Sequence, residues 1–169
     1  MKGLFTTVFL CLVLCQSASA DDKKPTPVKI SDVIMLRNAL IAATGGHDKI
    51  VGQNTIAHNQ LYDIDNNARW AMNDDIQILT PLITAIDKTI QEIRTKALAA
   101  NNGAPIPDKV DEQTSAQKIL VQKFNEDYVA LLNQTRELPA LTHIKRADFK
   151  EPLPSEIIVP LQQAGIIDP

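Results

Sequence analysis

The clearest pattern in the chain is a row of apolar residues between positions 72 and 97. They recur at alternating steps of four and three residues, and they are Met72, Ile76, Leu79, Ile83, Ile86, Ile90, Ile93 and Ala97. Such steps place side chains along one face of an α-helix. We therefore predict one long helix from about Asn66 to Ala99, with its isoleucine-rich stripe turned toward other helices.

Pro81 stands in the middle of this predicted helix. Because proline has no amide hydrogen, it either begins a second helix after a Thr80 cap or kinks one continuous helix, freeing the carbonyl of Gln77. The stripe keeps its phase across Pro81, and Pro81 itself falls on the opposite face. The pattern favours a single, kinked helix.

Three other segments also have helical spacing of their apolar residues. Residues 30–46 begin with Ser31 as the predicted N-cap and end at a pair of glycines, Gly45 and Gly46, and their predicted inward residues are Val33, Leu36, Leu40 and Ala43. Residues 114–134 predict a helix whose inward residues are Ala116, Leu120, Phe124, Tyr128, Leu131 and Leu132. A last helix is predicted to start at a Ser155 cap, run to Ala164 and stop at Gly165.

The remaining segments have no helical period. Residues 47–60 predict a loop with a turn of helix or a short strand, and residues 138–154 predict an extended stretch with a short strand at Leu141–Lys145. The fold class we expect is all-α, or mainly α with a minor extended segment. Residues 30–169 would form a single helical domain, a small bundle around the long helix.

The first 20 residues have the pattern of a cleavable signal peptide. Lys2 precedes an apolar run over residues 4–14, which is too short to span a bilayer, and an Ala-Ser-Ala sequence ends at Ala20. A lipoprotein signal is the competing interpretation, because Cys15 follows the apolar run, but Leu14 is larger than the residue that such a signal requires. We predict cleavage after Ala20, a flexible leader over residues 21–29, and a periplasmic or secreted protein.

Composition narrows the classes of function. Both cysteines lie before the predicted cleavage site, so the mature chain would have no disulfide and no thiolate. The full chain has a net charge of −3, and no basic run is longer than two residues. These features argue against nucleic-acid binding. We also expect no membrane insertion after cleavage, because no second apolar segment approaches the length of about 20 residues that a spanning helix needs.

One stretch has the spacing of a calcium-binding loop. Asp63, Asp65, Asn67 and Asp74 occupy its first, third, fifth and twelfth positions. The sixth position, where such a loop needs glycine, holds Ala68, and Asp74 is shorter than the usual glutamate. We therefore interpret this stretch as the start of the long helix, capped by Asp63 or Asp65.

The other candidates for chemistry are scattered. His47, His58 and His143 could meet Asp48 or Asp63 at a zinc site, but no two of the histidines have the spacing of a metal motif. The adjacent carboxylates Asp74/Asp75 and Glu126/Asp127 are interpreted as solvated faces. The serines Ser31, Ser115 and Ser155 are interpreted as residues of helix starts. We predict no catalytic residue, no metal and no cofactor.

Trp70 is the only tryptophan, and it lies on the polar face of the long helix. Either a C-terminal segment folds back over the indole, or the ring is an exposed contact for a partner protein. Trp70 is the one partner-binding residue that the sequence predicts.

The back half of the chain resembles a group of small, uncharacterised bacteriophage and prophage proteins. The resemblance covers about residues 60–168 and consists of a helix that starts "NARWAM", a helix "FNEDYVALLNQ", an extended "LTHIKRADF" and a closing "LPSEIIVPLQQAGII". It implies a compact helical protein and assigns no catalytic residue. The predicted export signal departs from that group, whose members are mostly intracellular.

Two hypotheses of different class follow. The first is an exported, non-enzymatic protein that acts by association, with itself as a homo-oligomer or with an envelope protein. The second is a small periplasmic hydrolase that uses a carboxylate pair or a His/Asp metal site. The isoleucine stripe, with no chemistry beside it, favours the first.

Overall fold

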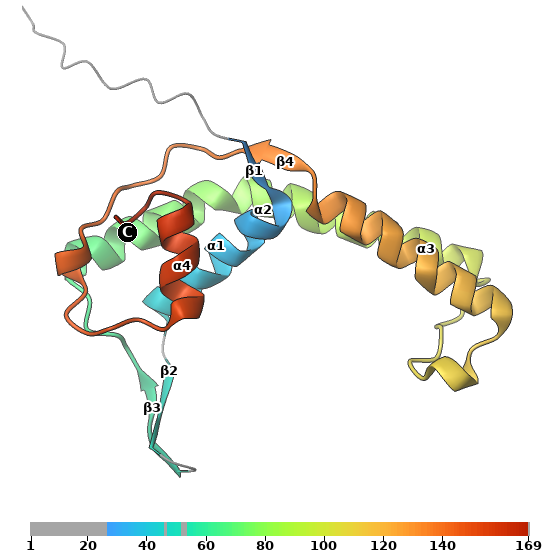
Figure 1. Ribbon diagram of the computed structural model, residues 1–169, viewed down its shortest axis with the longest axis horizontal. Coiled ribbons are helices and arrows are strands. Elements are labelled where there is room, and N and C mark those ends of the chain that lie inside the picture. Colours follow the sequence, from blue (N-terminus) through green and yellow to red (C-terminus); the bar gives the residue numbers. More distant parts are fainter. Residues whose placement is uncertain (1–26, 46, 52–53, 169) are drawn as a thin grey trace, which may run out of the picture.

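The protein is mainly helical (Figure 1). The computed structural model describes the backbone of residues 27–45, 47–51 and 54–168, and the side chains of residues 27–45 and 61–168. The predicted signal peptide, residues 1–20, and most of the predicted leader lie outside the described residues. The helices are α1 (Ile30–Thr44), α2 (Asn66–Ala100), α3 (Ser115–Leu132) and α4 (Ser155–Gln163). The fold class expected from the sequence is confirmed.

The long helix is confirmed almost residue for residue. The Oδ1 atom of Asp65 accepts a hydrogen bond from the amide of Asn67 at 2.8 Å, which caps the N-terminus of α2. The helix continues through Pro81, whose side chain is exposed to water. Because the ring lies on the solvent side, water can satisfy the carbonyl of Gln77 that proline leaves without a donor.

The hydrophobic core lies around the first half of α2. Helix α1 packs against both α2 and α4, so that three helices share one interior. The stripe supplies four of its buried side chains, Met72, Leu79, Ile83 and Ile86. The predicted inward face of α1, Val33, Leu36, Leu40 and Ala43, is also buried, as expected.

The second half of α2 leaves this core and pairs only with α3. The two helices run side by side away from the rest of the molecule, and a connection with a short 3₁₀ helix, η1 (Val110–Glu112), joins them at the tip (Figure 1). We call residues 87–129 the arm. Along it the stripe is only half-buried, at Ile90, Ile93 and Ala97.

The helix α3 starts as its sequence indicates. Thr114 and Gln117 form a reciprocal capping box, and Ser115 lies in the first turn. Five of the six residues predicted to face inward are buried or half-buried. The exception is Ala116, which is exposed because the first turn of α3 lies at the tip of the arm.

Two helix starts differ from the prediction. Helix α1 begins at Ile30, whose amide donates to the carbonyl of Gln134 at 2.9 Å, so Lys29 and not Ser31 occupies the N-cap position. Helix α4 begins at Ser155, because Pro154 takes the N-cap position. Both serines lie in first turns and hydrogen-bond to the acidic residue that follows them.

The glycines that follow α1 and α4 end these helices in different ways. Gly165 has a φ of +70°, and the amides of Gly165 and Ile166 donate to the carbonyls of Gln162 and Leu161, which is the Schellman arrangement. Gly45 is extended rather than left-handed. A Cβ atom there would lie 2.8 Å from the carbonyl oxygen of Ile41, so this position needs glycine for space.

The strands are short and differ most from the prediction. Strands β2 (His47–Val51) and β3 (Asn54–Gln60) form an antiparallel hairpin that projects from the helices (Figure 1). Strand β1 (Pro27–Lys29) pairs with β4 (Thr135–Glu137), so the last three residues of the predicted leader are not free. The expected strand at residues 141–145 is absent: this stretch has no strand partner, and the amide of Ile144 forms a single bond to the carbonyl of Ile166.

Long-range hydrogen bonds tie the loops to α2. The guanidinium group of Arg69 donates to the carbonyls of Thr44 and Tyr62, which flank the β2–β3 hairpin. The C-terminal half returns past α2 through an irregular segment, residues 138–145, before the 3₁₀ helix η2 (Arg146–Asp148) and α4. No helix in the described part of the chain is both long enough and apolar enough to cross a membrane.

Candidate association surfaces and a buried carboxylate

Asp75 is the one charged residue that is fully buried among the described side chains. It lies on α2 between Met72 and Leu79, with an exposed fraction of 0%. Its Oδ1 atom accepts a hydrogen bond from the amide of Thr142 at 3.0 Å, while its Oδ2 atom has no hydrogen-bond partner in the described structure. The prediction that Asp74 and Asp75 form a solvated face is therefore wrong for Asp75, although Asp74 is exposed.

Burial governs the protonation of this carboxyl group. Loss of solvation raises the pKa of Asp75 above its ordinary value, and the negative charge of Asp74 adds to that rise. The backbone amide and the hydroxyl of Thr142 act in the opposite direction, because they stabilise the carboxylate. Asp75 therefore holds the returning segment, residues 138–145, against α2 at an electrostatic cost.

The structure does not gather the four residues with calcium-loop spacing into one site. Asp65 caps α2, Asn67 donates its amide to that cap, and Asp74 is an exposed residue of the helix. Asp63 contacts the other end of the chain: its Oδ1 atom lies 3.6 Å from Nζ of Lys150. The side chains that the structure describes include no group of three or more His, Cys, Asp or Glu residues placed to hold a metal ion.

The predicted histidine candidates are only partly described. The side chains of His47, Asp48 and His58 lie outside the described residues, although their backbone belongs to the β2–β3 hairpin. His143 is described, and its Nε2 atom lies 3.2 Å from Oδ1 of Asp168. His143 therefore contacts the C-terminal end of the chain.

Trp70 is exposed. Its exposed fraction is 70%, so no C-terminal segment folds over the indole, and the first of the two sequence interpretations is wrong. The ring stands near the start of α2, on the face opposite the core. Its use by a partner stays a prediction.

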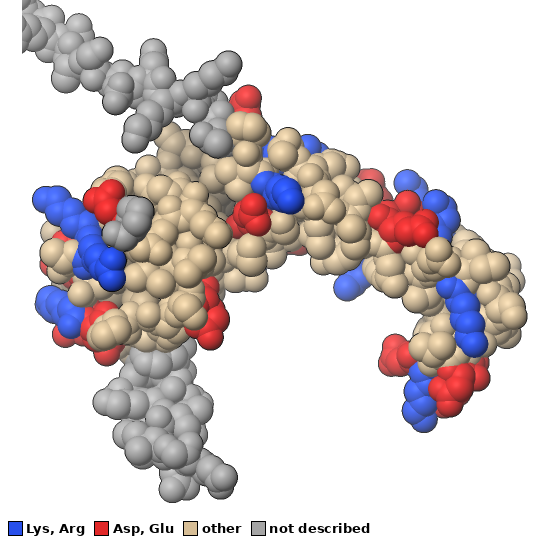
Figure 2. Space-filling model, viewed as in Figure 1, with Lys and Arg blue, Asp and Glu red and all other residues tan. Residues whose placement is uncertain are grey.

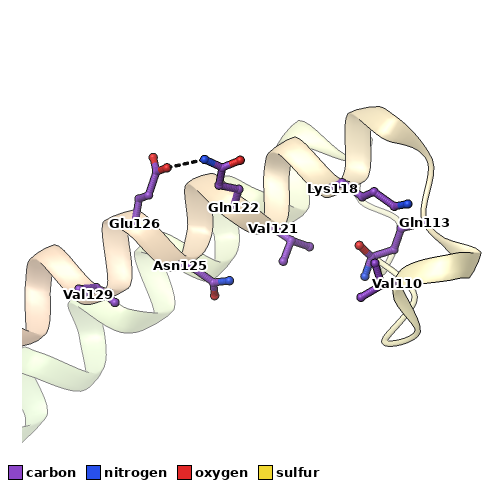
Figure 3. Close-up of a pocket in the computed structure, with 8 residues that line it drawn as sticks. All are labelled: Val110, Gln113, Lys118, Val121, Gln122, Asn125, Glu126 and Val129. Atoms are coloured by element: carbon purple, nitrogen blue, oxygen red, sulfur yellow. Dashed lines mark hydrogen bonds between the residues drawn. The ribbon is translucent and has the colours of Figure 1, made fainter.

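The arm carries several exposed aliphatic side chains. Val110, Ile119 and Val129 are 63%, 67% and 52% exposed, and all three lie on α3 or on the connection before it. A groove of about 540 Å³ runs along the outer face of α3 (Figure 3). Val110, Val121 and Val129 line it together with polar residues, of which Lys118 and Glu126 are charged.

Charges of both signs are distributed over the arm (Figure 2). Residues 87–129 contain seven acidic and six basic residues, so the arm is close to neutral. Two of its ion pairs are local, between Lys109 and Glu112 at 3.1 Å and between Lys123 and Asp127 at 3.6 Å. Such exposed pairs within one helical turn contribute little to stability.

A second groove lies between α1 and α4. It has a volume of about 680 Å³ and is lined mainly by apolar atoms from both helices, including Met35, Ala39, Ile157 and Val159. Met35 and Val159 are also partly exposed, at 46% and 42%. Unlike the arm, this groove belongs to the surface of the core.

Comparisons of the chain with protein-family models, with curated proteins and with solved structures gave no significant match. The function must therefore be argued from the geometry. Sequence reasoning overlooked two features of that geometry, the buried Asp75 and the valine-lined face of α3. Asp75 follows Ala68 by seven residues, and this spacing was the available signal that it lies on a buried face.

Proposed function

We propose that this protein is an exported, non-enzymatic protein that acts by association with other proteins through the arm. The observation that carries the proposal is the set of exposed aliphatic residues Val110, Ile119 and Val129, spread along the arm that projects from the core. Single exposed aliphatic residues are ordinary on protein surfaces, whereas their collection beside a groove marks a contact site. The signal-peptide pattern of residues 1–20 supports export.

The half-buried stripe adds to this argument. A two-helix hairpin buries only one side of each helix, and isolated pairs of helices are marginally stable in water. Ile90 and Ile93 remain half-buried where α3 alone covers them. A partner helix on the arm would remove more of this apolar surface from water, at about 25 cal/mol for each Å² buried.

Association also accounts for the described geometry better than the alternative. A small periplasmic hydrolase would need its acidic group to meet a substrate, and the pKa of Asp75 is raised as a general acid requires. The side chain is closed to water, however, and Asp74 is exposed to it. The two carboxylates thus do not share one accessible site.

Site-specific photo-crosslinking tests the proposal. A photoreactive amino acid replaces Ile119, on the exposed face of α3, in the full chain expressed in a host that exports it. The matched control replaces Lys88, which is exposed on α2 of the same arm but lies on the helix face opposite the stripe. We expect a discrete protein adduct from position 119 and none from position 88. No adduct from position 119, or equal adducts from both, would overturn the proposal.

A further inference from the structure

Opposite charges lie on either side of the middle of the groove on α3 (Figure 3). Lys118 and Glu126 stand four residues before and four residues after Gln122. Val121 lies between Lys118 and Gln122, Val129 lies beyond Glu126, and Val110, from η1, lies beside Lys118 rather than on α3. Two residues of opposite charge therefore flank the central Gln122 at equal spacing along α3.

This spacing fits a two-fold axis. In a contact between two identical surfaces, residue i of one copy meets residue j of the other, and residue j of the first meets residue i of the second. An antiparallel α3 pair centred on Gln122 places Lys118 against Glu126 twice. We propose that the arm binds a second copy of this chain in that arrangement.

The inference rests on the proposed function, because it names the partner of the same surface. The charges favour a second copy over a strongly charged partner. In the described part of the chain, Lys118 and Glu126 take part in no ion pair; Glu126 accepts a hydrogen bond from Gln122 at 2.9 Å. Seven acidic against six basic residues leave two arms with almost no net repulsion.

The size of the surface predicts a reversible dimer. Helix α3 has 18 residues, so at 1.5 Å of rise per residue it is about 27 Å long. One helix face of that length, with amides beside its valines, provides a contact at the small end of specific interfaces. Polar residues in such a helix–helix contact fix how the two helices align, but they weaken the binding. The dimer should dissociate on dilution.

Sedimentation equilibrium of charge variants tests the pairing. In the full chain, Lys118→Glu places two acidic residues opposite each other at both ends of the contact, and Glu126→Lys does the same with basic residues. We expect each single variant to raise the dissociation constant of the dimer about tenfold, which is about 1.4 kcal/mol. The double variant restores opposite charges, so its dissociation constant should return to within about threefold of the original.

The variants keep their fold by design, because Glu near the start of α3 and Lys in its second half both suit the helix dipole. Recovery in the double variant also excludes misfolding as the cause of the single-variant losses. A chain that stays monomeric at every concentration, or single variants that dimerise as well as the original, would overturn the pairing. If it is overturned while position 119 still crosslinks to a different protein, the proposed function stands.

Discussion

At the scale of single residues, Asp75 determines how stability responds to pH. Its folded-state pKa is raised, so the folded protein holds this proton to a higher pH than the unfolded chain does. Stability from this group is therefore fully present below the ordinary pKa of an aspartate and falls as the pH rises through the raised value. Above that value the carboxylate is charged inside the core.

Replacing Asp75 with asparagine removes this dependence. The amide oxygen can still accept from Thr142, but no charge has to be buried. We expect Asp75→Asn to gain stability relative to the original protein as the pH rises from about 4 to 7. The quantity compared is the free energy of unfolding of each protein. The change should be about 1.4 kcal/mol for each unit by which the pKa is raised.

Urea denaturation at several pH values measures that difference. The exposed neighbour supplies a matched control, since Asp74→Asn also removes a carboxylate but leaves the buried one in place. A constant difference between Asp75→Asn and the original across the pH range would contradict the assigned role of Asp75.

Trp70 differs from Asp75 because it is a large apolar residue that lies outside the core and contributes little to it. We expect Trp70→Ala to change the unfolding free energy by less than about 0.5 kcal/mol, as is usual for exposed positions. In the folded monomer, acrylamide should quench the indole fluorescence nearly as well as it does in urea. A strongly protected indole would mean that something covers the ring.

Local rules located both residues on the helix but did not determine what covers them. The helical period placed Trp70 on the outer face, which is where it lies, but whether another segment covers that face depends on the path of residues 138–168. Asp75 lies beside the stripe, and its charge suggested exposure. Its burial follows from the contact with Thr142, 67 residues away in the chain.

At the scale of elements, the continuity of α2 joins the core to the arm. Pro81 lies within this joint, where it removes one backbone hydrogen bond without ending the helix. In the interior of a helix proline is about 3 kcal/mol less favourable than alanine. Some of this penalty is offset because proline also restricts the unfolded chain.

We therefore expect Pro81→Ala to stabilise the protein by about 1–3 kcal/mol, measured by thermal or urea unfolding. Pro160, in α4, is a useful comparison because it is half-buried between α1 and α4, so its replacement by alanine also loses packing. A Pro81→Ala variant less stable than the original would show that α2 needs its proline, for example to direct the arm.

The helices were predictable because their signals are local. Spacing of apolar residues located α1, α2 and α3, and a polar cap marked the start of α2. The strands were not predictable in the same way. Strand β1 pairs with β4 more than 100 residues further along the chain, and the segment that forms the β2–β3 hairpin lacks the alternation of a half-buried strand.

At the scale of the whole molecule, the structure divides into a packed end and an exposed one. Core residues from α1, α4 and the first half of α2 stabilise the fold. The arm adds apolar surface that the described chain covers only in part. The division also explains why the candidate surface escaped sequence analysis: the stripe on α2 pointed to an association face, but the residues that line the groove lie on α3 and in the η1 connection before it.

Disulfide trapping tests the pairing of two arms most directly. In a chain whose Cys11 and Cys15 are replaced by serine, the variant Lys118→Cys/Glu126→Cys carries one thiol on each side of Gln122. The two positions are eight residues apart on α3, a rise of about 12 Å, so they cannot form a bond within one chain, because a disulfide requires Cα atoms within about 7 Å. We predict a covalent dimer under mild oxidation, and none with either cysteine alone; oxidation that leaves only monomers would contradict the account.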